Sequence, residues 1–232
     1  MDRPYVLLSC AISIDGYLDD ASDQRLVLSG PADMDRADEV RASCDAILVG
    51  AGTIRADNPR LLIRSEARRE ARAARGLADP LRVVLAGRGD LDPAARFFTA
   101  GQAGALVYVA SPAAAAARAR LAGPPADAEV VDAGSGPVDL HLVLADLAAR
   151  GVGRLLVEGG RSVHTQFLAA GLADELQLVI APFFVADSRA PRFAGDGDFP
   201  WTADRPARLA EVCQVGADVL LRFALSERFG TT

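Results

Sequence analysis

Residues 154–168 read RLLVEGGRSVHTQFL, and this stretch decides the fold class. An apolar run ends on Glu158, two glycines follow, and Arg161 opens a segment with the pattern of a helix. The order predicts a strand, a tight turn and the N-terminus of a helix. Backbone N–H groups and the helix dipole at such a turn favour an anion such as phosphate. The stretch therefore predicts an α/β unit with an anion site at its turn.

The side chains around this turn suit a polar ligand. Ser162 and Thr165 supply hydroxyl groups, and Arg161 supplies a full positive charge. Glu158 is costly to bury without a partner, so we expect it to face a polar ligand group. The alternative is that Glu158 pairs with an arginine and the two glycines only make a turn. His164 is expected to pack or to lie on the helix surface.

The rest of the chain alternates short apolar runs with helical patterns, which indicates a largely parallel α/β sheet. The apolar runs are continuous, as in a sheet covered on both faces. The last strand follows a long irregular stretch, 183–206, so we expect an antiparallel finish. No repeat or linker divides the chain, and one domain over 1–232 is expected, with 65–79 as a solvated insertion. The expected strands are 5–14, 46–50, 81–87, 105–110, 154–159, 175–182 and 218–225, and the expected helices are 31–44, 111–122, 141–151 and 162–172.

Composition excludes several kinds of chemistry. All 25 basic residues are arginine, so a Schiff-base lysine and a Walker-A lysine are absent. Two histidines, and three cysteines without ligand spacing, predict no metal site and favour a reducing cytoplasm. A net charge of −6 gives no field that favours nucleic acid, and no apolar run is long enough for a membrane span. The G-x-G-x-x-G fingerprint is also absent, which disfavours an ordinary Rossmann fold.

Ligands of such sheets bind at the carboxyl ends of the strands. After the strand 46–50, two glycines allow close backbone approach, Thr53 offers a hydroxyl, and Asp57 begins a turn. A plain strand and turn is the equally weighted alternative. After the strand 81–87, Gly87 permits close approach and Arg88 suits an anion, although an exposed turn arginine is the simpler interpretation. Asp15 is expected to build a turn, and contact with the substrate is the less favoured alternative.

Five fragments together resemble one family. They are SCAISIDGYL, RASCDAILVGAGTIRADNPRLLIR, LRVVLAGRGDL, LLVEGGRSVHTQFLAAGLADELQLVIAP and GADVLLRF. In this order they resemble the pyrimidine reductases of riboflavin biosynthesis, over about residues 5–223. The resemblance implies a dihydrofolate-reductase-like α/β fold, with a mixed, mostly parallel sheet flanked by helices and antiparallel C-terminal strands. It also implies NADPH as cofactor and a homodimer.

The resemblance further implies roles for individual residues. The reaction reduces the ribosyl carbon of a phosphoribosylamino-pyrimidine to a ribitylamino product. Arg41 and Arg64 would bind the substrate 5′-phosphate, Leu61 would offer a backbone contact, and Glu158 would hold the pyrimidine or sugar. Proton transfer would involve Glu158 or Asp57, which are the candidate catalytic residues. The implied cofactor-binding residues are Ile12, Thr53, Asp57, Gly87, Arg88, Gly159, Gly160, Arg161, Ser162, Val163, His164, Thr165 and Gln166.

Three departures bear on substrate and cofactor. Ser9 stands where bifunctional deaminase–reductases carry a substrate-binding lysine, which favours the 2,5-diaminopyrimidinone over the deaminated uracil compound. Val27 replaces a polar or large residue of the family. Ala86 and Gly87 replace the usual Asp-Ser, which leaves NADH open beside NADPH. Two alternatives therefore stay open: a reductase of another small substrate, and a nucleotide-binding protein without catalysis.

Overall fold

The computed structural model describes residues 3–22, 24, 26–101 and 103–230. The chain forms two compact units, which are described separately. The first comprises Asp38–Leu156 and the N-terminal residues up to Pro4, and the second comprises Tyr5–Ala37 and Val157–Thr232. Two elements cross the boundary along the chain: helix α1 (Pro31–Ala42) and strand β6 (Arg154–Gly159).

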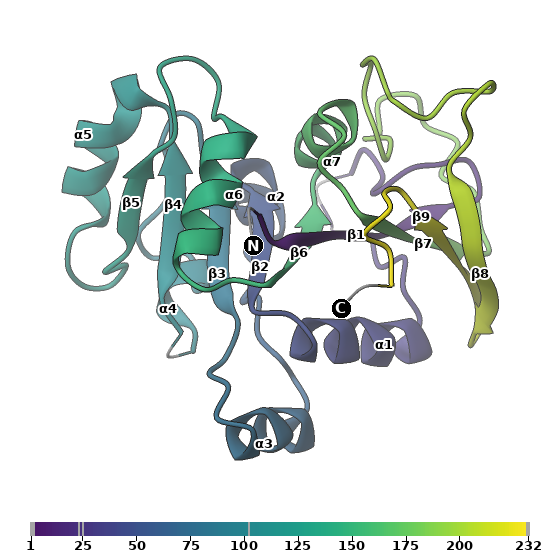
Figure 1. The fold of residues 1–232 in the computed structure, drawn as a ribbon, viewed down its shortest axis with the longest axis horizontal. Helices are drawn as coiled ribbons and strands as arrows, with labels where there is room; N and C mark the ends of the chain where they lie inside the picture. The colour runs from purple at the N-terminus through teal and green to yellow at the C-terminus, as the bar shows by residue number, and fades with distance from the viewer. Residues whose placement is uncertain (1–2, 23, 25, 102, 231–232) are drawn as a thin grey trace. The chain divides into compact units, whose positions relative to one another are not determined.

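The first unit contains four parallel strands in the order β5-β4-β3-β2. Every residue of β2 and β4 is buried, as their continuous apolar sequences predict. Helix α5 packs against β4 and β5 (Figure 1). The strands are β2 (Ala46–Gly50), β3 (Leu81–Leu85), β4 (Ala105–Val109) and β5 (Glu129–Asp132), and the helices are α2 (Ala51–Asp57), α3 (Glu66–Ala74), α4 (Arg96–Thr99), α5 (Ser111–Leu121) and α6 (Leu140–Ala149).

The two long helices of this unit show why their sequences fold as they do. Helix α6 buries Val143, Leu144 and Leu147, which recur at helical spacing. It ends before Gly151, whose φ of 85° suits a helix C-terminus, as the sequence predicts. Helix α5 buries one face, including Ala117 and Leu121, because alanines allow the helix to lie close to the sheet.

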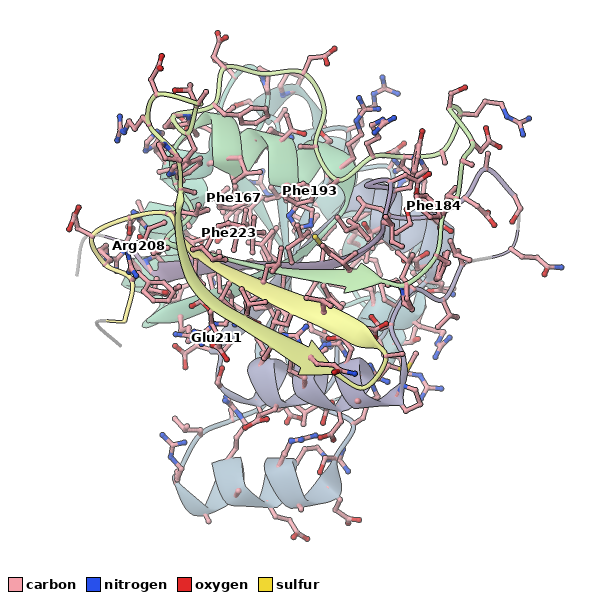
Figure 2. All side chains as sticks on the ribbon, turned by 90° about the vertical axis from the view of Figure 1, so that its right-hand side faces the viewer. Phe167, Phe184, Phe193, Arg208, Glu211 and Phe223 are labelled. Atoms are coloured by element: carbon pink, nitrogen blue, oxygen red, sulfur yellow. The ribbon has the colours of Figure 1, made fainter. Side chains whose placement is uncertain are left out.

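The second unit holds β1 (Tyr5–Ser13), β7 (Glu175–Ala181), β8 (Arg208–Val215), β9 (Asp218–Ala224) and helix α7 (Arg161–Ala169). Strands β1 and β7 are parallel, whereas β7–β9 and β9–β8 are antiparallel. Figure 2 shows Glu211 and Phe223 on opposite faces of the β8–β9 hairpin, as their register requires. The predicted mixed, mostly parallel sheet with antiparallel C-terminal strands is confirmed. The prediction of one domain stays a prediction.

Several elements differ from the expectation. Strands β5 and β8 were not predicted, because both are largely exposed and lack a continuous apolar run. The stretch 183–206 is irregular, as expected, but β8 follows it before the last strand. Helices α3 and α4 were also missed.

The segment 65–79 is not simply a solvated insertion. Arg72 of α3 is only 6% exposed, and its guanidinium donates to the carbonyl oxygens of Ala42, Cys44 and Ala78. These charge-assisted hydrogen bonds anchor the C-terminal part of the helix. No helix among the described residues is long and apolar enough to cross a membrane.

Candidate functional site

The turn between β6 and α7 has the geometry that its two glycines predict. Gly159 has a φ of +129°, which side-chain-bearing residues rarely adopt. Gly160 is the N-cap of α7 and has no side-chain capping hydrogen bond. Glu158 is half-buried at the end of β6. The turn thus joins a carboxylate at the strand end to a helix N-terminus that suits an anion.

The side chains of the first turns of α7 divide by exposure. Arg161 and Ser162 are exposed, whereas Val163 and His164 are buried. Gln166 donates to the hydroxyl of Ser162 over 3.0 Å and to its carbonyl oxygen. The side chains available to a ligand here are therefore the polar ones, and Val163 and His164 have only their backbone to offer.

Thr165 of α7 connects the helix to the irregular segment that follows β7. Its hydroxyl donates to the carbonyl oxygen of Arg161 and accepts from the N–H of Gly195, at 2.7 and 2.8 Å. A Cβ at Gly195 would lie 3.2 Å from Nε of Arg161. The absence of a side chain at Gly195 therefore leaves room for Arg161 at the helix N-terminus.

His164 is a buried histidine whose imidazole ring makes no hydrogen bond to the described residues. It is 0% exposed, both ring nitrogens lack a partner among these residues, and its ring lies 5.4 Å from that of Phe193. Burial lowers the pKa of His164 to about 4, from an ordinary value of 6.5. The imidazole is therefore neutral near pH 7 and packs, as one of the sequence interpretations held.

We expect His164 to make the folded chain sensitive to mild acid. Because its pKa is lower in the folded than in the unfolded chain, its contribution to stability is lost as pH falls from 6.5 towards 4. At pH 5 the loss is about 2 kcal/mol of unfolding free energy. Urea unfolding of His164→Leu at pH 7 and pH 5 should show a smaller difference than the wild type. His141→Leu is the control, since His141 lies exposed on α6, and an unchanged pH dependence in His164→Leu would contradict the assignment.

The end of β1 contains two of the predicted residues and a turn. Ser9 and Ile12 are 9% and 7% exposed. Asp15 accepts hydrogen bonds from the hydroxyl of Ser13 and from the N–H groups of Val185 and Ala186. Desolvation acts to raise the pKa of Asp15, but these hydrogen bonds lower it to about 2. The structural role expected for Asp15 is confirmed.

In the first unit, the segment after β2 forms helix α2, which ends where the turn at Asp57 was expected. Helix α2 begins after the N-cap Gly50 and contains Thr53 and Asp57, both partly exposed. A Cβ added at Gly52 would meet no atom within 4 Å. The fold itself therefore does not require a glycine at position 52, which fits a ligand that approaches the backbone.

Gly87 at the end of β3 shows the same feature. A Cβ at this position would meet only a methyl of Val138, at 3.9 Å. The neighbouring Arg88 is exposed, as expected for an arginine of a turn or of an anion site. Gly87 and Gly52 both follow parallel strands of the first unit, where α/β sheets bind ligands.

The segment that carries Leu61 and Arg64 is held in an unusual conformation. Leu61 is 3% exposed and has a φ of +49°, which is uncommon for a residue with a side chain. Arg41 of α1 donates to the carbonyl oxygen of Leu62 over 3.0 Å. The side chain of Arg64 is exposed, and no hydrogen bond or ion pair joins its guanidinium to another described residue.

The structure thus brings the predicted residues together in two groups. Arg41, Leu61 and Arg64 belong to one connected part of the first unit, and Thr53, Asp57, Gly87 and Arg88 follow its strands β2 and β3. In the second unit, Glu158 and residues 159–166 share one turn and helix, and Ser9 and Ile12 lie on β1.

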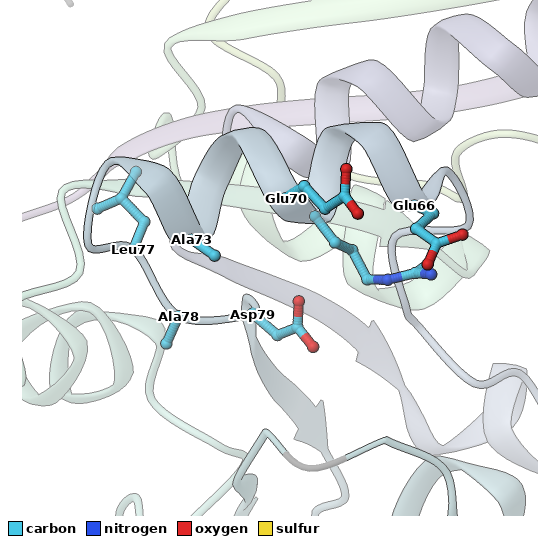
Figure 3. A pocket seen from close by; sticks show the side chains of 7 residues that line it. Glu66, Glu70, Ala73, Leu77, Ala78 and Asp79 are labelled. Atoms are coloured by element: carbon cyan, nitrogen blue, oxygen red, sulfur yellow. The ribbon is translucent and has the colours of Figure 1, made fainter.

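A groove beside α3 contains none of the predicted residues. It has a volume of about 390 Å³, and three carboxylates face it, those of Glu66, Glu70 and Asp79 (Figure 3). Its other lining residues are Arg69, Ala73, Leu77 and Ala78. The predicted phosphate-binding function therefore does not fall in this groove.

Comparison with known families decides the relationship of this chain. A model described as the RibD C-terminal domain matches residues 4–221. The chain belongs to this family. Its relatives include proteins named 2,5-diamino-6-ribosylamino-4(3H)-pyrimidinone 5′-phosphate reductase. The one from Methanothermobacter thermautotrophicus is 37% identical over 84% of this chain and 85% of its own length. The one from Archaeoglobus fulgidus is 33% identical over 98% of this chain and 99% of its own length.

Solved structures of RibD-related proteins are also similar. Acinetobacter baumannii RibD matches with a TM-score of 0.77 and 26% identity. The match covers 97% of this chain and 58% of the length of the Acinetobacter protein. A pyrimidine reductase-like protein from Corynebacterium diphtheriae matches with a TM-score of 0.76 and 25% identity, over 95% of this chain and 91% of its own length. The resemblance stated from the sequence fragments is therefore confirmed.

Membership in a reductase family implies a nicotinamide cofactor, and the residues of this chain fit such a cofactor. The Gly159–Gly160 turn leads into a helix N-terminus with exposed Arg161 and Ser162, which suits a diphosphate. Gly52 and Gly87 leave free space where a side chain would stand. The sequence analysis gave no signal for Asp38, which accepts hydrogen bonds from the N–H groups of Arg64 and Ser65.

Proposed function

We propose that this chain catalyses the NADPH-dependent reduction of the ribosyl group of 2,5-diamino-6-ribosylamino-4(3H)-pyrimidinone 5′-phosphate, a step of riboflavin biosynthesis. The observation that carries the proposal is the Glu158–Gly159–Gly160 turn at the N-terminus of α7, in a chain with full-length relatives named for this reaction. The turn supports both requirements of the reaction, an anion seat and an adjacent carboxylate.

The proposal assigns cofactor binding to individual residues. Backbone N–H groups from Gly160 onward, the hydroxyl of Ser162 and the charge of Arg161 bind the diphosphate. Thr53 and Asp57 offer polar groups to the cofactor, and Gly87 gives the backbone close access. Arg88 is assigned to the 2′-phosphate, and it is the reason to propose NADPH rather than NADH.

The proposal assigns the substrate to residues of different chemistry. The guanidinium of Arg64 is exposed and makes no hydrogen bond to the described residues, so it can bind a phosphate without breaking an existing one. Arginine suits this role, because its planar fork matches phosphate oxygens. Arg41 contributes a second guanidinium to the same segment, and Leu61 a backbone group. Glu158 orients the pyrimidine or the sugar by accepting hydrogen bonds.

The chemistry then needs little from the protein beyond orientation and electrostatics. When bound, the reduced nicotinamide supplies the hydride that reduces C1′ of the ring-opened imine. Glu158 holds the substrate in the reactive position and fixes the path of a proton, directly or through water. Asp57 is the second candidate for proton transfer. No lysine base is required, which agrees with a sequence that contains no lysine.

Ser9 is proposed to select the diamino substrate. A lysine at this position would add a charge next to the pyrimidine, whereas the serine is small and neutral. We expect the chain to oxidise NADPH at least tenfold faster, by kcat/KM, with the diamino compound than with 5-amino-6-(5-phosphoribosylamino)uracil. Absorbance loss of NADPH with the two compounds, measured side by side, checks this. Equal or reversed rates would refute the role of Ser9, and no oxidation with either would refute the proposed function.

Two further features belong to the proposal. A homodimer is expected from the family resemblance, and size-exclusion chromatography with light scattering measures it. The cytoplasm is the expected location for a reductase with three free cysteines.

A further inference from the structure

The backbone of the segment 62–65 is held by side chains on both sides. Asp38 of α1 accepts hydrogen bonds from the N–H groups of Arg64 and Ser65, the latter over 3.0 Å. Arg69 of α3 donates to the carbonyl oxygens of Ile63 and Arg64, both at 2.8 Å. Both backbone polar groups of Arg64 are thus bound by charged side chains, which make stronger hydrogen bonds than neutral groups.

Asp38 is unusually well placed for this contact. It is 2% exposed, and its carboxylate also pairs with Arg68 at 3.1 Å. Burial acts to raise the pKa of Asp38, but the N–H groups of Arg64 and Ser65 and the guanidinium of Arg68 lower it. A buried carboxylate that is ionised and fully partnered fixes its partners in one geometry.

The segment needs such restraint because its conformation is strained. Leu61 has a φ of +49°, and a left-handed residue with a side chain persists only where its surroundings hold it. The side chain of Arg64 nevertheless extends into solvent without a partner among the described residues. A rigid backbone that carries an unbound guanidinium is the arrangement expected of a preorganised anion contact.

From these contacts we infer that Asp38 and Arg69 are positioning residues that orient Arg64 toward the substrate 5′-phosphate. The inference rests on the proposed function. Neither residue touches the phosphate. They fix the backbone from which Arg64 reaches it, so that less conformational freedom is lost on binding.

The test compares Asp38→Asn and Arg69→Met with the wild type, using the phosphorylated substrate and the corresponding riboside without phosphate. For the phosphorylated substrate, each variant is expected to raise KM roughly tenfold, with kcat and the KM for NADPH within about twofold. For the riboside, kcat/KM should equal that of the wild type. If the two residues only anchored α3, their replacement would lower kcat/KM for both substrates alike.

Asp45→Asn is the matched control. Asp45 also binds two backbone N–H groups with its carboxylate, those of Gly153 and Arg154 at 2.9 and 2.8 Å, but no hydrogen bond joins it to the segment 62–65 among the described residues. This control should leave the substrate KM unchanged. Asp38→Asn in an Arg64→Ala background should add no further increase in KM, because the oriented group is already absent.

The possible results distinguish a failure of this inference from a failure of the proposed function. An unchanged KM in both variants, in a wild type that reduces the substrate and in which Arg64→Ala raises KM, overturns the inference alone. An equal loss of kcat/KM with the phosphorylated substrate and with the riboside also overturns the inference. A wild type that oxidises no NADPH with either pyrimidine overturns the proposed function, and the inference falls with it.

Discussion

Replacement of Glu158 by glutamine is expected to lower kcat by about 100-fold and to leave NADPH affinity within about threefold. Glu158 is half-buried at the end of β6, immediately before the glycines assigned to the diphosphate. Glutamine keeps the size of the side chain but cannot accept a proton or carry a negative charge. Steady-state oxidation of NADPH and fluorescence titration of NADPH measure the two quantities separately.

Glu66→Gln is the control for this substitution, because Glu66 is exposed at the start of α3. It should keep wild-type kcat and NADPH affinity. A Glu158→Gln variant with wild-type kcat would remove Glu158 from the reaction. A variant that lost NADPH affinity instead would make Glu158 a cofactor residue.

Replacement of Gly159 by alanine is expected to destabilise the fold by about 2 kcal/mol and to weaken NADPH binding at least tenfold. The φ of Gly159 is +129°, and the new Cβ would lie 3.3 Å from Nε2 of the buried His164. The backbone must then leave the conformation that presents the turn to the diphosphate. Urea unfolding measures the stability, and NADPH titration measures the binding.

Substitutions at two other glycines distinguish backbone strain from loss of ligand access. A Cβ at Gly136 would meet nothing within 4 Å and its φ is not in the left-handed region, so Gly136→Ala should change neither quantity. Gly87→Ala has similar steric freedom and should keep wild-type stability while it weakens NADPH binding. A Gly159→Ala variant that binds NADPH as tightly as the wild type would contradict the role of the turn.

Much of the fold could be predicted because its central strands carry continuous apolar sequences. Strands β2 and β4, which are fully buried, were expected at nearly their observed bounds. Strands β5 and β8 were not, because exposed strands mix polar and apolar residues without a buried run. Helix α3 was missed since it consists of charged residues and alanines, and the hydrogen bonds from Arg72 to distant carbonyl groups leave no apolar signal in the sequence.

The site shows the same division. The glycine turn at 159–160 and the helix that follows it were predicted, because local chain order determines them. The left-handed Leu61 and the contacts of Asp38 depend on residues more than twenty positions apart, which no local pattern reports. The burial of His164 was left open, since a helix position alone does not say which face packs.

The most direct test of the proposed function uses NADPH deuterated on either face of the nicotinamide C4, with the diamino phosphoribosyl-pyrimidinone as substrate. The account predicts that one of the two labelled cofactors delivers a single deuterium to C1′ of a ribitylamino product, as mass spectrometry and NMR would show. A product without deuterium from either cofactor, or no product while NADPH remains reduced, would contradict it.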